Sequence, residues 1–67
     1  MFHYKVKYSW LTGIGSERVY EYDIYIAENC QEAADLCRNE YGHLPGMRVE
    51  FIWKSNYGSW LAVNAWR

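Results

Sequence analysis

The chain has little of what catalysis or metal binding needs. Its 67 residues include two cysteines, two histidines and one proline. The histidines, His3 and His43, lie far apart, and neither has a Cys, Asp or Glu at the spacing of metal ligands. No order of Ser, His and Asp indicates a catalytic triad. We therefore expect a protein that is not an enzyme and that uses no metal or cofactor.

An excess of one charge and a long apolar run are also missing. Seven basic and eight acidic residues give a formal net charge of −1. General nucleic-acid binding depends on neutralising many phosphates, so this balance argues against it. No apolar run approaches the roughly 20 residues that cross a bilayer. The first ten residues alternate apolar side chains with lysines, unlike a signal peptide. We expect a soluble, intracellular protein with no membrane partner.

The two cysteines, Cys30 and Cys37, do not suit an internal disulfide. If both are helical, they lie about 10 Å apart along the helix axis. A disulfide needs Cα atoms within about 7 Å. We expect both to be small, buried apolar residues, with an intermolecular bridge or a redox role as the alternative.

Aromatic side chains are what the chain has in excess. It holds four Trp, seven Tyr and two Phe, more than so small a core needs. Many of them recur at every second position, which is the period of a β-strand. Because a strand has two faces, some of these rings must face solvent. Surplus Trp and Tyr on a small surface are typical of contact with another macromolecule. The sequence therefore predicts a binding protein.

Two alternating segments, residues 2–11 and 18–27, predict an antiparallel hairpin joined by the connector 12–17. One register pairs apolar residues with apolar residues and lysines with acids, each pair contributing a few tenths of a kcal/mol. The pairs are Tyr8–Tyr20, Val6–Tyr22, Tyr4–Ile24, Lys7–Glu21 and Lys5–Asp23.

The period then changes to that of a helix. Asn29 and Glu32 have the spacing of a capping box. We expect Gly42 to end the helix in the left-handed conformation, with Pro45 blocking any extension. The small residues Ala33, Ala34 and Cys37 belong to an apolar stripe that would let the helix lie close to a sheet.

Two further strands follow, at residues 46–54 and 60–66, with a turn within 55–59. The register expected for them sets Val49, Phe51 and Trp53 opposite Ala65, Val63 and Leu61. The prediction is a single α+β domain over residues 1–67, in the order ββαββ, with one helix packed on one face of a four-stranded antiparallel sheet.

One helix covers one face, so the other face is the candidate binding surface. We expect the helix side to hold Tyr4, Val6, Tyr22, Ile24, Ile26, Val49, Phe51, Leu61 and Val63. On the other side, the expected partner-binding anchors are Tyr25, Ile52, Trp60 and Trp66, with Arg48, Lys54, Lys5 and Lys7 to steer and orient a partner. Curvature of the sheet could instead bury the tryptophans, or the same patch could form a homodimer.

The stretch from Tyr22 to Val49 resembles tiny phage proteins in which a strand ends in Ala, a capped Glu-Ala helix follows and a strand returns. The matching residues are Ile24-Tyr25-Ile26-Ala27-Glu28-Asn29, Gln31-Glu32-Ala33-Ala34, Tyr41-Gly42 and Arg48-Val49-Glu50. Over this section the chain is similar to the small podophage inhibitor of bacterial RNA polymerase. It is also similar to a type I-F anti-CRISPR with a sheet wrapped on one helix, through its length and through Gly58-Ser59-Trp60-Leu61 in the final hairpin.

The resemblance implies a phage-encoded inhibitor that binds and blocks a bacterial host complex in the host cytoplasm, with a Cas effector complex as the first expectation. An alternative is an RNA-polymerase inhibitor that uses the acidic helix rim of Glu32, Asp35 and Glu40. A single-stranded nucleic-acid-binding module is a further alternative, since some RNA-binding sheets stack bases on exposed rings. Those sheets carry more basic residues, so nucleic acid is the less expected partner. A small enzyme or metal protein is the remaining alternative.

Overall fold

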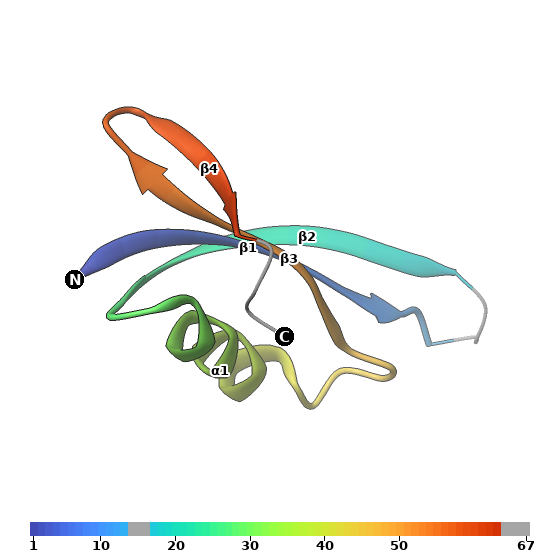
Figure 1. Ribbon diagram of the computed structural model, residues 1–67. Coiled ribbons are helices and arrows are strands. Elements are labelled where there is room, and N and C mark those ends of the chain that lie inside the picture. The colour runs from blue at the N-terminus through green and yellow to red at the C-terminus, as the bar shows by residue number, and fades with distance from the viewer. Residues whose placement is uncertain (14–16, 64–67) are drawn as a thin grey trace.

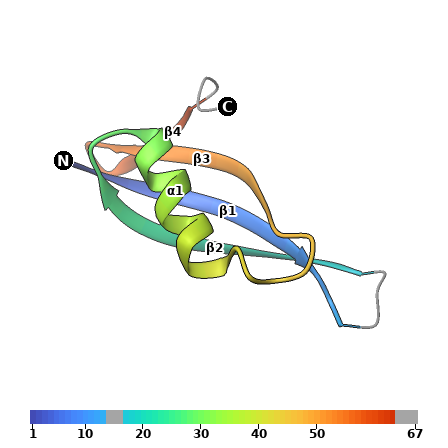
Figure 2. The same cartoon turned by 90° about the horizontal axis from the view of Figure 1, so that it is seen from below.

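The computed structural model describes residues 1–13 and 17–63. The elements are β1 (Phe2–Leu11), β2 (Arg18–Ala27), α1 (Cys30–Tyr41), β3 (Arg48–Asn56) and β4 (Ser59–Val63). The strands form one antiparallel sheet in the order β2-β1-β3-β4, and α1 lies across one face of it (Figures 1 and 2). The predicted α+β fold in the order ββαββ is therefore confirmed.

The first two strands have the bounds that the alternation predicts. A hydrogen bond of 2.9 Å from the Thr12 N–H to the Glu17 carbonyl closes the connector between them. The second hairpin turns at Tyr57 and Gly58, whose φ angles are 47° and 84°. This left-handed pair suits the twist of two strands joined by two residues. β3 therefore runs two residues past the predicted end of that strand, and residues 64–66 lie outside the described part of the chain.

The helix begins as the capping box predicts. The Asn29 side chain accepts a hydrogen bond of 2.8 Å from the Glu32 N–H, and the Glu32 carboxylate accepts one of 3.1 Å from the Glu28 N–H. The expected left-handed end at Gly42 is wrong, because Gly42 continues the right-handed conformation with φ −63°. The first positive φ after the helix is the 60° of Gly46, just before β3.

The core lies between α1 and the sheet. Its buried residues are Tyr4, Val6, Tyr8, Ala27, Ala33, Ala34, Cys37 and Ile52. Small side chains on α1 allow the helix to approach, so the Tyr8 ring stacks on Tyr41 with centroids 4.2 Å apart. Cys37 is fully buried and Cys30 half-buried, and neither forms a disulfide. Burial raises the pKa of the Cys37 thiol to about 11.

The pairing of β1 with β2 differs by one residue from the predicted register. Tyr8 lies opposite Glu21 rather than Tyr20, and Lys5 and Lys7 lie opposite Ile24 and Tyr22. A shift of one residue moves every side chain of a strand to the other face. The predicted pairs of lysine with acid are therefore wrong. The residues Tyr22, Ile24 and Ile26, expected beneath the helix, lie on the opposite face.

The junction between β2 and α1 explains this register. Ala27 is the last residue of β2 and is fully buried in the core that α1 covers. Because side chains alternate along a strand, Tyr25 and Asp23 then share the helix side with Ala27. Tyr41 on α1 holds this arrangement with a hydrogen bond of 2.8 Å from its hydroxyl to Asp23.

The pairing of β3 with β4 also differs by one residue from the prediction, with Ile52 opposite Val63. Ile52 lies opposite Val6 of β1 and is fully buried beneath the helix. Phe51 and Trp53, its neighbours in β3, consequently point to the other face. The pairing of β3 with β1 shifts between Lys7 and Tyr8, because β3 has a bulge there.

Candidate functional site on the open face of the sheet

The face of the sheet opposite α1 carries five aromatic rings and two lysines. Residues directly opposite each other in an antiparallel pair share a face, and the observed pairings bring these seven together. We call this surface the open face; its members are Lys5, Lys7, Tyr20, Tyr22, Phe51, Trp53 and Trp60. Tyr20 and Tyr22 are 51% and 55% exposed, so the surface is accessible.

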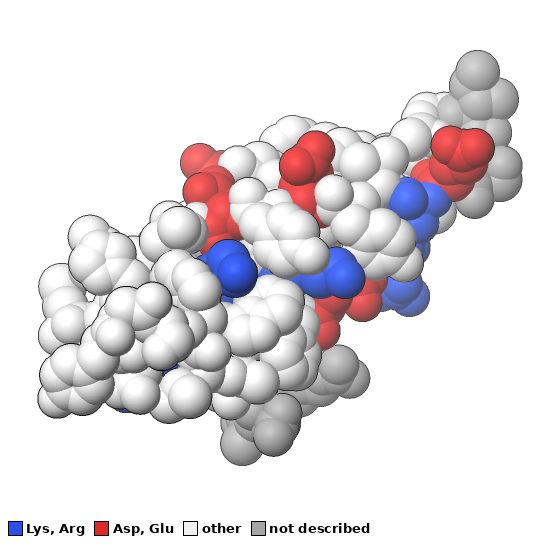
Figure 3. Space-filling model, turned by 90° about the horizontal axis from the view of Figure 1, so that it is seen from above, with Lys and Arg blue, Asp and Glu red and all other residues white. Residues whose placement is uncertain are grey.

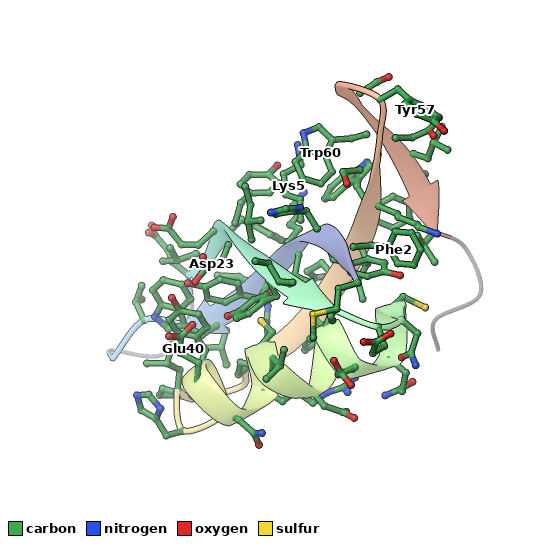
Figure 4. All side chains as sticks on the ribbon, turned by 90° about the vertical axis from the view of Figure 1, so that its left-hand side faces the viewer. Phe2, Lys5, Asp23, Glu40, Tyr57 and Trp60 are labelled. Atoms are coloured by element: carbon green, nitrogen blue, oxygen red, sulfur yellow. The ribbon has the colours of Figure 1, made fainter. Side chains whose placement is uncertain are left out.

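Lys5 lies at the centre of the open face. Its Nζ atom is 5.0 Å from the centroid of the Trp53 ring, 5.2 Å from that of Trp60 and 5.7 Å from that of Tyr22. These separations are within the ~6 Å over which a cation is attracted to a ring. The three rings come from three different strands, β3, β4 and β2. Figure 4 shows Lys5 and Trp60 together on the side of the sheet away from the helix.

Lys7 extends the same arrangement along β1. Its Nζ atom lies 5.0 Å from the Tyr20 centroid and 6.0 Å from the Tyr22 centroid. Tyr22 also approaches Trp53, with centroids 6.0 Å apart. Trp53 in turn meets Phe51 edge to face at 4.8 Å. The open face is therefore a continuous set of rings with two ammonium groups among them.

The two lysines make no salt bridge within residues 1–13 and 17–63. The ion pairs found there join Arg38 to Asp35 at 3.3 Å and Arg48 to Glu50 at 3.1 Å. Figure 3 shows the open face, where cationic side chains emerge between uncharged ones, and acidic groups lie along one edge and beside the basic groups toward one end. Among the described residues, no carboxylate therefore lies within salt-bridge distance of the Lys5 or Lys7 ammonium group.

The helix side of the sheet keeps its acids in a hydrogen-bonded network. The Tyr25 hydroxyl donates to Glu40 at 2.7 Å, and Tyr41 donates to Asp23. Figure 4 shows Asp23 and Glu40 close together beside the helix. Burial pushes the pKa of Asp23 upward, but the hydrogen bonds from Tyr41 and from the Ile24 N–H outweigh it and hold this pKa below its ordinary value.

A polar cluster lies at the end of the sheet near the β3 bulge. The buried Ser9 hydroxyl donates to the Glu50 carboxylate, while Arg18 donates to the Ser9 oxygen at 2.8 Å and to the Gly46 carbonyl at 2.9 Å. The Ser9 hydrogen bond and the charge of Arg48 lower the pKa of Glu50. This cluster ties the loop before β3 to the first hairpin.

Three of the predicted partner-binding residues, Lys5, Lys7 and Trp60, do share the open face. Arg48 is opposite Ser9, which is in turn opposite Tyr20, so it lies on the same side at the end of the sheet, where it pairs with Glu50. Trp66 lies outside the described residues.

The other three predicted members of this face are placed elsewhere, so their expected position was wrong. Ile52 is fully buried in the core. The half-buried Tyr25 faces the helix, where desolvation and its hydrogen bond to Glu40 raise its pKa. Lys54 lies on the helix side, with its Nζ 3.7 Å from the centroid of the Phe2 ring. The expected register of the first hairpin, deduced from charge pairing, accounts for the error at Tyr25, and the face expected for β3 accounts for those at Ile52 and Lys54.

Four rings of the open face escaped prediction: Tyr20, Tyr22, Phe51 and Trp53. The sequence did contain a pattern that places Tyr20 and Tyr22 of β2 on this face. Ala27 is the small residue just before the helix cap, and it must lie where the helix approaches the sheet. Counting back from Ala27 by twos puts the even-numbered residues of β2 on the far side.

Comparison of the chain with protein-family models, curated proteins and solved structures finds no match. Among residues 1–13 and 17–63, no helix is long and apolar enough to cross a membrane. The same residues contain no group of three His, Cys, Asp or Glu side chains placed to hold a metal ion.

Proposed function

We propose that this is a non-enzymatic binding protein that acts through its open face, and that it blocks a bacterial host complex. The observation that carries the binding role is the set of five rings and two lysines gathered on the face opposite the helix. Tyr and Trp are the residues that most often dominate the energy of an interface. They supply large contact areas at a low cost in side-chain entropy, because each has only two side-chain torsions.

The size of the molecule supports an interface of ordinary area. Its principal extents are 41 × 20 × 18 Å. The broad side of such a molecule is comparable with the ~800 Å² that each partner contributes to a standard interface. The rings of the open face contact one another and the lysines, so they are held in place before a partner arrives. Preorganisation of this kind lowers the entropy cost of binding.

The identity of the host complex is proposed from the resemblance of residues 22–49 and of the last hairpin to phage inhibitors. A Cas effector complex, blocked in the manner of an anti-CRISPR, is the first candidate. The alternative, inhibition of RNA polymerase through the acidic helix rim, has less support from the side chains. Glu32 caps the helix, Asp35 pairs with Arg38 and Glu40 accepts from Tyr25, so each acid of that rim already has a partner within the protein.

The test is inhibition of purified complexes by increasing amounts of the protein. DNA cleavage by a type I-F effector complex and transcription by bacterial RNA polymerase would be measured with the wild type and with a Tyr22→Ser/Trp60→Ser double variant. The matched control is Tyr57→Ser, which removes a fully exposed tyrosine at the tip of the β3–β4 hairpin (Figure 4).

We expect the wild type and Tyr57→Ser to inhibit DNA cleavage near one equivalent per complex, and the double variant to fail. Far-UV circular dichroism would show that both variants keep the fold. If excess protein leaves both complexes fully active, the inhibitor role is wrong. If the double variant inhibits as well as the wild type, the open face is not the surface that acts.

A further inference from the structure

We propose that the open face binds single-stranded nucleic acid, with bases stacked on its rings and phosphates near Lys5 and Lys7. This inference rests on one part of the proposed function, namely that the open face is the binding surface. It goes further by naming the chemical class of the molecule that this surface contacts.

The charge distribution points to an anionic partner. The formal net charge of −1 describes the whole chain, whereas the acids and lysines of the first hairpin lie on opposite faces. Glu21 and Asp23 are opposite Tyr8 and Val6, on the helix side. The observed register thus leaves Lys5 and Lys7 among rings and aliphatic residues, and places Ser9, Arg48 and the Glu50 carboxylate that both contact at one end of the sheet. An anion on this face would meet two ammonium groups and no acid from β2.

The arrangement of rings selects a partner with flat groups. Phe51 and Trp53 lie on the central strand β3, and Tyr20 and Tyr22 lie on β2, with the lysines of β1 between them. The backbone rises about 6.4 to 6.8 Å over two residues of a strand, and the Phe51 and Trp53 ring centroids lie 4.8 Å apart. A four-stranded antiparallel sheet with helices behind it and rings on its free face is the platform on which some RNA-binding domains stack two or three bases.

Stacking and charge together favour a single strand over a duplex. Every unpaired base presents a flat face that an aromatic side chain can stack against, whatever the sequence. In a duplex the bases stack on each other and are not available to the rings. Two lysines are also few for a duplex, whose binding depends on neutralising many phosphates. An acidic protein segment would satisfy the lysines but would place no flat group on Trp53 or Tyr22.

The direct test is fluorescence anisotropy with a labelled oligothymidylate of about 20 nucleotides, longer than the ~4–16 nucleotides that one small domain covers. The matching RNA, a duplex and a labelled oligoglutamate peptide serve as comparisons. We expect the single strands to bind with a Kd of about 1 to 100 μM at physiological salt, a range typical of sequence-independent binding. Contact of two lysines with phosphates predicts a slope of about −1.4 for log K against log salt concentration.

Variants assign the binding to the open face. Removal of one stacked ring, by Tyr22→Ser or Trp60→Ser, should weaken binding about 5- to 150-fold. Lys7→Gln should bring the salt slope close to about −0.7, the value for one phosphate contact. Tyr57→Ser should bind like the wild type. Should Trp60→Ser fail to fold, the exposed Tyr20→Ser and Tyr22→Ser variants address the same question from the edge strand.

Three results would overturn the inference: no saturable binding of either single strand, binding unchanged in all the ring variants, or duplex bound as tightly as single strand. Binding of oligoglutamate without binding of oligonucleotide would assign the face to an acidic protein segment. The inhibition assay separates the two proposals. If open-face variants lose inhibition and no oligonucleotide binds, the proposed function stands and this inference is wrong. If oligonucleotides bind and neither complex is inhibited, this inference stands and the host-complex role is wrong.

Discussion

Removing the charge of Lys5 should destabilise the protein, although this lysine makes no salt bridge within the described chain. Its Nζ atom lies 5.0 to 5.7 Å from the centroids of three rings, Tyr22, Trp53 and Trp60. A cation–π contact at an exposed site contributes about 0.5 to 1 kcal/mol. Because one half-buried ammonium serves all three rings, we expect a total of about 1 to 2 kcal/mol.

The variant that isolates this contribution is Lys5→Met, which keeps a long apolar stem over the rings and removes the charge. We expect its free energy of unfolding, from urea denaturation followed by far-UV circular dichroism, to fall by about 1 to 2 kcal/mol. A domain of this size has a total stability on the order of 3 to 10 kcal/mol. The change should therefore appear as a decrease in Tm of several degrees, since about 1 kcal/mol corresponds to ~4–8 °C in small domains.

Two comparisons make the test specific to the rings. Lys7→Met should cost less, because the Nζ of Lys7 has two rings at 5.0 and 6.0 Å. In Lys5→Ala, tetramethylammonium should restore part of the lost stability, because a quaternary ammonium suits a cluster of aromatic rings. Sodium chloride at equal ionic strength controls for screening. If Lys5→Met were as stable as the wild type, and tetramethylammonium acted equally on all variants, the cation–π explanation of this site would be refuted.

Three further predictions concern the helix side. Tyr41→Phe should lower the free energy of unfolding by about 1 to 2 kcal/mol at pH 7, because it removes a hydrogen bond to the charged Asp23. The folded-state pKa of Asp23 is lowered, so its stabilisation is present above the ordinary carboxyl pKa and is lost as pH falls through the folded value. Tyr41→Phe should flatten that loss in acid titrations followed by circular dichroism. Ile52→Ala should cost about 2 to 5 kcal/mol in urea denaturation, because it opens a cavity in the core. Alkylation by iodoacetamide at pH 8, followed by mass spectrometry, should be slow at Cys37 and faster at Cys30. The Cys37 thiol is buried and its pKa is raised to about 11. Equal alkylation rates at the two cysteines would contradict the burial of Cys37.

Local patterns predicted the elements well. The alternation of residues 2–11 and 18–27 marked both strands with their observed bounds, and Asn29 with Glu32 marked the start of the helix. These signals depend on side-chain period and on hydrogen bonds between residues three or four apart, so the sequence contains all that they need. The end of the helix was harder, because Gly42 can adopt either hand and only its surroundings select one.

The site was only partly predictable because both faces of the strands carry rings. In β2, Tyr20 and Tyr22 lie on the open face and Tyr25 lies on the helix side. Because both faces carry rings, the hydrophobic period alone does not choose between them. Pairing lysines with acids favoured the wrong choice. The energy of such pairs is a few tenths of a kcal/mol, whereas burying Ile52 and Ala27 beneath the helix contributes more than that through packing.

Local residue patterns are enough to specify the order ββαββ, the helix cap, the excess of aromatic rings and the presence of Lys5 and Lys7 on one face of β1. Which rings meet those lysines depends on how the strands and the helix pack. The Lys5 ammonium reaches rings from β2, β3 and β4, and the face on which each ring lies depends on register. In β3 that register follows from the packing of Ile52 beneath α1 and opposite Val6 of β1, a contact between segments far apart in the chain that no local pattern of residues encodes.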